Sequence, residues 1–285
     1  MTELAATAVV PHHGDTIDTV VRLPVLDALE RRLLVAHALG MSRVALITRS
    51  ETVLDAAQAQ RIAELFKRRH HGEPIAYLLG EREFHGLDFA VSPAVLIPRA
   101  DTELLVDLAI ALIPRQGSAL DLGTGSGAIA VALGAQRRDV QVTATDLSEA
   151  ALTIARSNAV RHSVSLRLLR SDWFAALNGE QFSMIVSNPP YIAAGDMHLT
   201  QGDLRFEPID ALTDHADGLN AVRNIVSNAS KFLDDDGWLL IEHGYDQAGA
   251  VRSLIDHAQF YDVQSWRDLA GIERVSGGRK SPHTT

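Results

Sequence analysis

The chain contains 285 residues, of which 46% are hydrophobic, and it carries a formal net charge of −10 at pH 7. It has no cysteine, which excludes disulfides, thiolate metal ligands and cysteine nucleophiles. The negative charge disfavours a broad grip on nucleic acid phosphates, and no apolar run reaches the ~18 residues of a membrane span. The first residues lack the basic flank and apolar core of a signal peptide. We therefore expect a cytoplasmic protein that binds neither membranes nor nucleic acid.

The sequence pattern of the N-terminal quarter predicts a small helical domain. Residues 1–20 show no apolar period and are predicted to form a flexible extension. Its adjacent residues His12 and His13 lack acidic partners at ligand spacing, so no metal site is expected. Apolar side chains then recur at helical spacing in three segments between residues 25 and 70. These segments predict a helical domain over residues 21–75.

A change of pattern marks the next segment. Residues 76–97 are predicted to form a β-hairpin linker, because aromatic residues, glycines and alternating apolar residues replace the helical spacing there. An extended stretch follows, and it places Arg99 beside the expected edge of a sheet. Asp101 or Thr102 can then cap a helix over residues 103–112.

Apolar strands alternate with helices over residues 98–276, which predicts an α/β domain with a parallel sheet. Its first strand, 118–122, precedes a glycine-rich loop. The loop consists of Gly123, Thr124, Gly125, Ser126 and Gly127. Glycine at alternate positions lets the backbone approach a ligand where a Cβ atom would clash. The spacing differs from the dinucleotide fingerprint, and no basic residue suggests a phosphate cradle.

Acidic and aromatic residues follow the next two predicted strands. Asp146 ends the strand 140–145, 19 residues after Gly127, and is placed to accept both hydroxyls of a ribose. Asp172 and Trp173 follow the third strand, where they can bind the amine and the ring of a purine. Alternatively, Asp146 caps the next helix, Asp172 closes a turn and Trp173 packs in the core. A ribose and a purine without a phosphate cradle fit S-adenosylmethionine better than NAD or ATP.

The tetrapeptide Asn188-Pro189-Pro190-Tyr191 follows a buried strand over residues 182–186. Two prolines stiffen the backbone and leave its carbonyls free, while Asn188 adds a side-chain carbonyl and Tyr191 a flat ring. Such a turn can hold a planar NH2 group by accepting its hydrogens and stacking on its plane. The alternative is a simple strand-ending turn, since Asn-Pro is a common breaker.

The remaining residues complete the predicted domain. Residues 193–216 form a long polar loop that includes Glu207, and loops of this length are usually functional or disordered. Further helices and strands then close the sheet. Residues 277–285 are predicted to form a flexible polar tail.

These motifs resemble the Rossmann-like class I methyltransferases, and more narrowly the HemK/PrmC family of protein-(glutamine-N5) methyltransferases. The narrower resemblance rests on Gly80-Glu81-Arg82-Glu83-Phe84, Leu96-Ile97-Pro98-Arg99-Ala100-Asp101-Thr102-Glu103 and Asn188-Pro189-Pro190-Tyr191-Ile192. Further matches are Phe206-Glu207-Pro208, Gly218-Leu219 and Asp268-Leu269-Ala270-Gly271. The resemblance spans residues 74–275, and the helical segment before them is similar to the family's substrate-facing domain.

The resemblance implies that the protein methylates the glutamine of the Gly-Gly-Gln motif in peptide chain release factors. We expect it to act as a monomer. S-adenosylmethionine is the implied methyl donor and S-adenosylhomocysteine the product. The implied catalytic residues are Asn188, Pro189 and Tyr191. Pro190, Arg99 and Glu207 are implied as further substrate contacts. The expected cofactor contacts are Gly123, Thr124, Gly125, Ser126, Gly127, Asp146, Asp172, Trp173 and Asn188.

Three other functions remain open from the residues alone. A glutamine methyltransferase acting on a ribosomal protein would share the chemistry. An adenine or cytosine amino-methyltransferase would use the same tetrapeptide, but it would need a basic face that this chain does not obviously supply. A non-enzymatic S-adenosylmethionine-binding module would leave the amide-binding turn without a purpose.

Overall fold

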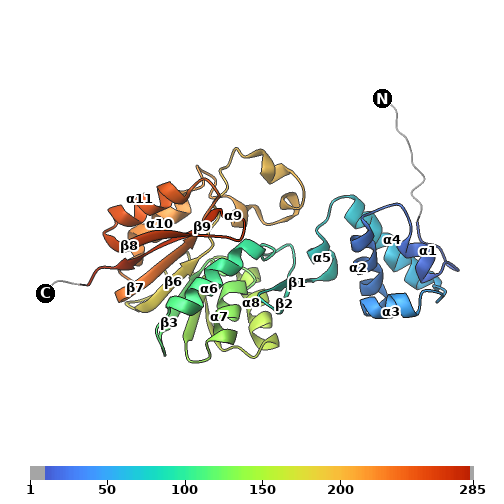
Figure 1. Ribbon diagram of the computed structural model, residues 1–285, viewed down its shortest axis with the longest axis horizontal. Coiled ribbons are helices and arrows are strands. Elements are labelled where there is room, and N and C mark those ends of the chain that lie inside the picture. The colour runs from blue at the N-terminus through green and yellow to red at the C-terminus, as the bar shows by residue number, and fades with distance from the viewer. Residues whose placement is uncertain (1–9, 283–285) are drawn as a thin grey trace. The chain divides into compact units, whose positions relative to one another are not determined.

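The computed structural model describes residues 10–282. The chain divides into two compact units, one ending at Gly80 and the other beginning at Glu81 (Figure 1). Each unit has a hydrophobic core of its own.

The described part of the first unit is helical. Its helices are α1 (Ile17–Val21), α2 (Ala28–Leu39), α3 (Arg43–Thr48), α4 (Ala56–His70) and α5 (Ile75–Leu79). Leu34, Ile62 and Phe66 are buried in its core, as expected for the apolar stripes of α2 and α4. The last of the three predicted helical segments begins at Ala56, where the Asp55 side chain caps it by accepting from the Gln58 backbone N–H at 2.7 Å.

The prediction of a flexible extension over residues 1–20 is wrong for its second half, and residues 1–9 lie outside the described residues. Residues 17–21 form α1, whose Ile17 and Val20 are fully buried in the helical core. The Thr16 hydroxyl caps this helix by accepting from the Thr19 backbone N–H at 3.2 Å. A single helical turn offers too short an apolar period to recognise in sequence.

The hairpin is shorter than the predicted linker over residues 76–97. It pairs β1 (Glu81–Phe84) with β2 (Leu87–Ala90), and both strands belong to the second unit. Residues 75–79 form a helix instead. This helix ends at Gly80, whose φ of 75° is the left-handed conformation of a helix C-cap. The hairpin packs into the core of the second unit through Phe84 and Phe89, whose rings meet edge to face.

The second unit is built on a seven-stranded sheet with the order β5-β4-β3-β6-β7-β9-β8. The strands are β3 (Ser118–Leu122), β4 (Gln141–Asp146), β5 (Leu166–Arg170), β6 (Phe182–Ser187), β7 (Leu233–Glu242), β8 (Phe260–Arg267) and β9 (Glu273–Lys280). The first five in chain order run parallel, and β9 is antiparallel to both of its neighbours. This confirms the predicted α/β class with a Rossmann-like sheet.

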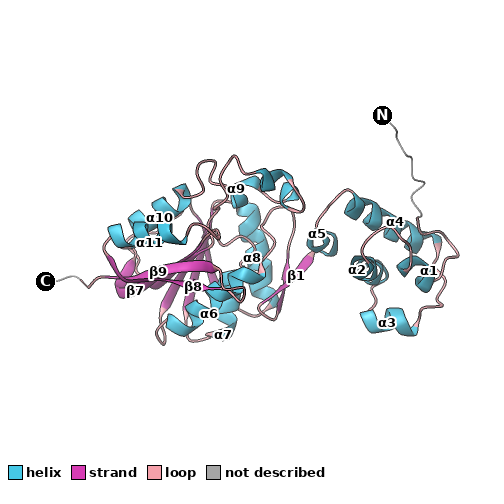
Figure 2. Cartoon of the chain, turned by 45° about the horizontal axis from the view of Figure 1, so that its top comes forward, coloured by secondary structure: helices cyan, strands magenta, loops and turns pink. Residues whose placement is uncertain are grey.

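Helices cover both faces of this sheet (Figure 2). One face packs against α6 (Glu103–Leu112), α7 (Ala128–Gln136) and α8 (Glu149–Arg161). The other face packs against α10 (Asn220–Ala229) and α11 (Ala248–His257), while the short α9 (Ile209–Leu212) lies in the loop after β6. Alternate residues of one strand serve the two faces: Met184 belongs to the first core and Ile185 to the second.

The strand order places a crevice at the centre of the sheet. From β3 the chain proceeds outward through β4 and β5, then returns to β6 on the other side of β3. Ligands of open α/β sheets bind where the strand order reverses in this way, outside the carboxyl ends of the strands. The glycine loop after β3 and the Asn188–Tyr191 turn after β6 are therefore the two sides of one crevice. No helix among residues 10–282 is long and apolar enough to cross a bilayer.

The prediction of a flexible tail over residues 277–285 is wrong up to Lys280, because β9 continues through the two glycines to that residue; residues 283–285 lie outside the described part. A Cβ atom on Gly277 would lie 2.5 Å from the Leu239 carbonyl oxygen of β7. Polar composition suggested a tail, whereas the glycines allow two strands to approach closely.

We expect Gly277→Ala to destabilise the protein by about 1–3 kcal/mol, the range for overpacking a filled interior. Denaturant unfolding measures this loss. Gly249→Ala is the matched control, because Gly249 lies in α11 with open space around its Cα. That change should be neutral or stabilising by up to ~1 kcal/mol. Equal stability of both variants would contradict the close packing of β9.

Candidate functional site

The loop after β3 is held against the end of β4 by backbone hydrogen bonds. The N–H groups of Gly123 and Thr124 both donate to the Thr145 carbonyl oxygen at 2.9 Å. Gly123, Gly125 and Gly127 all have positive φ, at 73°, 56° and 81°. L side chains rarely adopt this conformation, so the backbone path itself requires glycine at alternate positions.

The glycines of the loop have different surroundings. A Cβ atom on Gly127 would lie 3.1 Å from the Cβ atom of Ala155, so this glycine allows the loop to pack against α8. Gly125 has no protein atom within 4 Å of such a Cβ position. Gly125 therefore faces open space, whereas Gly127 serves packing.

Asp146 lies beside this open space at the end of β4. Its Oδ2 accepts from the Gly125 N–H and its Oδ1 from the Ser148 N–H, both at 2.8 Å. Burial raises the pKa of this carboxyl, and the two backbone donors oppose that rise. Each oxygen keeps a second lone pair for a ligand hydroxyl, so Asp146 both orders the loop and remains able to accept from a ribose.

A second acid, Asp121, was missed in the sequence analysis. It lies in β3 just before the glycine loop, is only 1% exposed, and its Oδ2 accepts from the Thr124 hydroxyl at 2.6 Å. Its Oδ1 has no hydrogen-bond partner among the described residues, and burial raises the pKa of the carboxyl to about 7. A buried carboxylate in this state suits a cationic ligand group such as an ammonium. The sequence signal that could have identified Asp121 is an acidic residue inside an otherwise apolar strand.

Asp172 and Trp173 follow β5 on the same edge of the sheet. Asp172 is exposed, whereas Trp173 is partly buried and its ring lies 3.8 Å from a Cβ position on Gly123. Trp173 has a φ of 47°, which is unusual for a bulky residue and is a form of backbone strain found at binding sites. The ring thus flanks the glycine loop, as stacking on a ligand there requires.

The turn after β6 is joined directly to β3. Ser187 pairs with Leu122 in the parallel register, and its hydroxyl donates to the Leu122 carbonyl oxygen at 2.8 Å. The next residue, Asn188, donates from Nδ2 to the Thr102 hydroxyl oxygen at 3.1 Å. This is the only side-chain hydrogen bond of Asn188 within residues 10–282, so its Oδ1 stays available as an acceptor.

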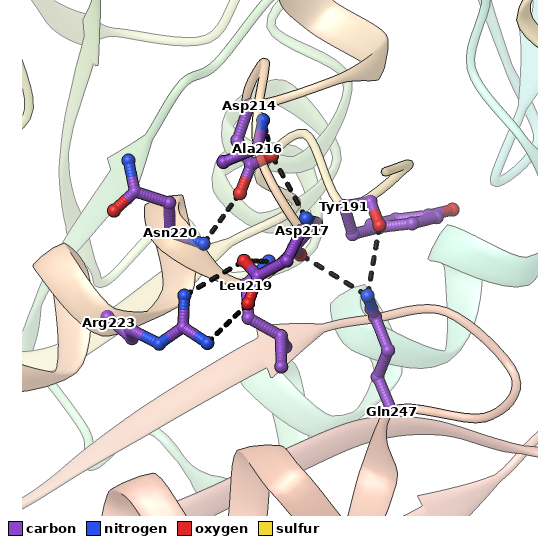
Figure 3. Close-up of polar contacts among 9 residues, drawn as sticks. Tyr191, Asp214, Ala216, Asp217, Leu219, Asn220, Arg223 and Gln247 are labelled. Atoms are coloured by element: carbon purple, nitrogen blue, oxygen red, sulfur yellow. Dashed lines mark hydrogen bonds and ion pairs between the residues drawn. The ribbon is translucent and has the colours of Figure 1, made fainter. Parts of the chain in front are cut away.

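Both the side chain and the backbone of Tyr191 are hydrogen-bonded. Its hydroxyl donates to Glu242 Oε1 at 3.4 Å, and burial, together with the charge of that carboxyl, raises the pKa of the tyrosine. Its carbonyl oxygen accepts from Gln247 Nε2 at 3.0 Å (Figure 3). The ring therefore remains a neutral phenol with a restricted orientation.

The end of the long loop and the residues that follow it close against this turn (Figure 3). The Asp214 carboxylate accepts from the backbone N–H groups of Ala216, Gly218 and Asn220 at 2.9, 3.0 and 2.6 Å. A Cβ atom on Gly218 would lie 2.4 Å from the Tyr191 carbonyl oxygen, so glycine is required there. The Gly218-Leu219 match noted in sequence thus has a steric reason.

Arg99 and Glu207 form an ion pair that was not anticipated. The buried Glu207 carboxylate contacts the Arg99 guanidinium with one oxygen and accepts from the Ile97 N–H at 3.0 Å with the other. Both oxygens are engaged within the protein, so this pair fastens the loop 193–216 to the segment before α6. Arg99 keeps about a third of its side chain exposed (35%), so the guanidinium can still meet a substrate.

The expected cofactor and amide contacts therefore lie along one edge of the sheet, at the carboxyl ends of β3 to β6, and the Arg99–Glu207 pair comes from the segments before α6 and after β6. One side of the crevice offers a bent glycine loop with two acids, and the other a stiff turn with unpaired acceptors. No group of three or more metal-ligating side chains occurs within residues 10–282. The arrangement suits a cationic nucleoside beside a planar amide.

Comparisons with known proteins agree with this geometry. Residues 21–80 match the PrmC N-terminal domain and residues 100–203 the Methyltransferase small domain. The release factor glutamine methyltransferase of Burkholderia pseudomallei is 55% identical over 273 residues, which cover 93% of this chain and 96% of the relative. This chain belongs to the release factor glutamine methyltransferase family. The family member from Bordetella pertussis is 51% identical over 258 residues, covering 90% and 96% of the two chains.

The fold extends beyond the family. A methyltransferase from Pyrococcus furiosus superposes with a TM-score of 0.53 at 20% identity, covering 76% of this chain and 98% of that one. The class I methyltransferase fold is thus confirmed. S-adenosylmethionine fits the site: its ammonium suits the unpaired oxygen of Asp121, its ribose suits Asp146, and its lack of phosphate suits a loop without basic residues.

We expect Asp146→Ala to weaken S-adenosylmethionine binding by roughly 1.5–3 kcal/mol, the scale of charge-assisted hydrogen bonds, as measured by calorimetry. Gly125→Val should weaken it more, because a branched side chain would fill the open space. The matched control is Gly179→Val, which shares the positive φ and the open surroundings but precedes β6 at the opposite edge of the sheet. Unchanged binding in the Gly125 variant would exclude the loop from the site.

Proposed function

We propose that this protein transfers a methyl group from S-adenosylmethionine to the side-chain amide nitrogen of the glutamine in the Gly-Gly-Gln motif of peptide chain release factors. The observation that carries the proposal is the Asn188 carboxamide, whose Nδ2 donates to Thr102 and whose Oδ1 is thereby left as an acceptor. Family membership supports the substrate, since the named relatives are release factor glutamine methyltransferases.

A glutamine amide is a weak nucleophile because its nitrogen lone pair is delocalised into the carbonyl group. Its reaction therefore depends on orientation more than on acid-base help. Asn188 Oδ1 and the Pro189 carbonyl oxygen each accept one amide hydrogen, which aims the nitrogen into the crevice. The same acceptors stabilise the positive charge that develops on that nitrogen during transfer.

The rest of the turn restrains the amide. Tyr191 stacks on its plane, and two consecutive prolines keep the carbonyl groups in place, since their φ is confined near −65°. Arg99 and Pro190 border the entrance, and Glu207 acts by holding Arg99. S-adenosylmethionine supplies an electrophilic methyl group on its sulfonium sulfur. The amide proton leaves to water.

Asn188→Ala should lower kcat by at least ~100-fold, the loss seen when one hydrogen-bonding group at a reacting centre is removed. S-adenosylmethionine binding should stay nearly unchanged, because the glycine loop and Asp146 hold that ligand. Methyl transfer to purified release factor and calorimetric titration measure the two quantities. Asn224→Ala, at an exposed asparagine on α10, is the control and should keep full activity. A parallel fall of binding and activity in the Asn188 variant would make that residue structural.

The helical unit is the proposed docking site for the body of the release factor. A single glutamine offers too little surface to be selected among all amides of the cell, so recognition requires a second contact. The short helix α3 presents Val44 and Ile47 on one turn, with 68% and 77% of each residue exposed. Apolar side chains this exposed and this close together are suited to a protein partner.

Replacing both Val44 and Ile47 by aspartate should raise the KM for whole release factor by well over tenfold, which is more than ~1.4 kcal/mol of lost binding. The rate with a short Gly-Gly-Gln peptide should not change, since the peptide lacks the body of the release factor that would contact α3. Val160→Asp is the matched control, because Val160 is an equally exposed apolar residue (75%) on α8 of the other unit. Equal losses on both substrates would assign α3 a structural role.

The same proposal places the reaction in the cytoplasm, where release factors work, and has a monomer act on the protein substrate without nucleic acid. The net charge of −10 supports the last point, since binding to phosphate backbones relies on Lys and Arg.

A further inference from the structure

Gln247 is a polar residue beside the proposed amide-binding turn that the mechanism above does not use. It stands just before α11, and its carboxamide joins three separate segments of backbone. Its Oε1 accepts from the Gly244 N–H at 2.9 Å. Its Nε2 donates to the carbonyl oxygens of Tyr191 at 3.0 Å and of Gly218 at 3.3 Å (Figure 3). One side chain thus connects the loop after β7, the turn after β6 and the segment that follows the long loop.

We propose that Gln247 is a positioning residue for methyl transfer, which holds the main chain of Tyr191 and thereby fixes the ring that stacks on the substrate amide. The inference rests on the proposed function, because that function assigns Tyr191 to the glutamine amide. Both hydrogens of the Gln247 NH2 group are engaged by backbone carbonyls. Gln247 therefore acts through Tyr191 and touches neither substrate nor cofactor.

The partners of Gln247 permit a single orientation of its carboxamide. A backbone N–H can only donate, and a backbone carbonyl oxygen can only accept. The carboxamide oxygen must therefore face Gly244, and its nitrogen must face Tyr191 and Gly218. A flipped carboxamide would set its NH2 group against an N–H and its oxygen against two carbonyl oxygens. The stable orientation is thus the one that binds Tyr191.

The peptide group between Tyr191 and Ile192 is bonded on both sides. Its oxygen accepts from Gln247, while its N–H donates to the Leu212 carbonyl oxygen at 3.0 Å. The Tyr191 hydroxyl contacts Glu242 at 3.4 Å, so this residue is held at its main chain and at the far end of its side chain. The ring lies between these two anchors. Loss of the Gln247 donor removes one of them.

Close packing places these groups in direct contact. A Cβ atom on Gly218 would lie 2.4 Å from the Tyr191 carbonyl oxygen and 3.0 Å from Gln247 Nε2. Only a glycine leaves room for the donor and the acceptor to meet at this point. The Gly218-Leu219 match noted in sequence therefore preserves the contact between Gln247 and Tyr191.

The Gln247 side chain is itself held in place by Gly244. The Gln247 backbone N–H donates to the Gly244 carbonyl oxygen at 3.1 Å while its side chain accepts from the Gly244 N–H, so the two residues are bonded reciprocally. The buried His243 ring contacts the same carbonyl oxygen through Nδ1 at 2.9 Å and the Ser276 hydroxyl through Nε2 at 2.8 Å. Because a carbonyl oxygen only accepts, Nδ1 carries the proton. Gln247 is thus preorganised to bind Tyr191.

The test is Gln247→Glu, which at neutral pH keeps the shape and the acceptor for Gly244 but offers no donor to the two carbonyl oxygens. We expect kcat to fall about 10- to 100-fold, because small displacements of a reacting group are costly. KM for S-adenosylmethionine and for release factor should change less than about twofold, since neither binds to Gln247. Gln247→Leu should lose as much kcat. The control is Gln136→Glu, at an exposed glutamine that ends α7, which should keep full activity.

A double variant separates positioning of the ring from general support of the fold. If Gln247 acts through the Tyr191 ring, adding Gln247→Glu to Tyr191→Ala should lower kcat by less than about twofold. Multiplied losses in the double variant would overturn the inference. A wild-type kcat in Gln247→Glu, or a parallel fall of kcat and S-adenosylmethionine affinity, would overturn it as well.

Amide hydrogen exchange tests the junction without any activity. The N–H groups of Ile192 and Ala194 donate to the carbonyl oxygens of Leu212 and Ala216, both at 3.0 Å, next to the bond from Gln247. In Gln247→Glu these two amides should exchange about tenfold faster, because this part of the turn opens more often, and the control variant should leave them unchanged. Unchanged exchange in Gln247→Glu would refute the inference. Absence of methyl transfer to release factor by the wild-type protein would refute the proposed function instead.

Discussion

The parallel pairing of β3 with β6 is the constraint on which the site depends. Leu122 lies opposite Ser187, so the two strands end at the same level and their following loops begin side by side. The Ser187 hydroxyl, bonded to the Leu122 carbonyl oxygen at 2.8 Å, fixes this level. A shift by one residue would exchange the faces of every side chain on β6. The glycine loop after β3 and the Asn188–Tyr191 turn after β6 would then no longer border one crevice.

Buried acids without full sets of partners surround this crevice. Asp121 and Glu242 each retain an oxygen that no described residue satisfies, and burial raises the pKa of both to about 7. Such groups lower the stability of the apo protein, because desolvation of a carboxylate is costly. Asp121 lies near the end of the strand before the glycine loop, and Glu242 contacts Tyr191 of the turn that we propose binds the amide. The two acids that lower the stability of the protein thus lie at the proposed site.

Residues from several distant segments of the second unit hold the turn that we propose binds the weakly nucleophilic amide. Asn188 is held by Thr102 from the turn before α6. Tyr191 is held by Glu242 from β7 and by Gln247 at the start of α11. These partners lie 51 to 86 positions away along the chain. Rigid positioning of an amide acceptor is therefore a property of the whole sheet edge. Selection of the protein substrate is left to surfaces elsewhere, among which the exposed turn of α3 is our proposed contact.

Much of this protein was determined by local sequence. The alternation of apolar strands and helices, the glycine loop and the Asn-Pro-Pro-Tyr turn identified the fold class and the family, because periodicity and backbone restrictions act over a few residues. The position of Asp146 after its strand followed from the same logic. Elements below the length of a clear period were missed, as with α1, or misjudged by composition, as with the glycines of β9.

Only the tertiary structure decided the partners of these groups. Sequence could not reveal that Glu207 is neutralised by Arg99, 108 positions away, or that Glu242 contacts Tyr191 across 51 positions. It also could not tell apart Gly125, which faces open space, from Gly127, which packs on Ala155. The physical reason is the same in each case. Burial, pKa and the choice of a hydrogen-bond partner depend on which distant segments the sheet brings together, and no local pattern encodes that.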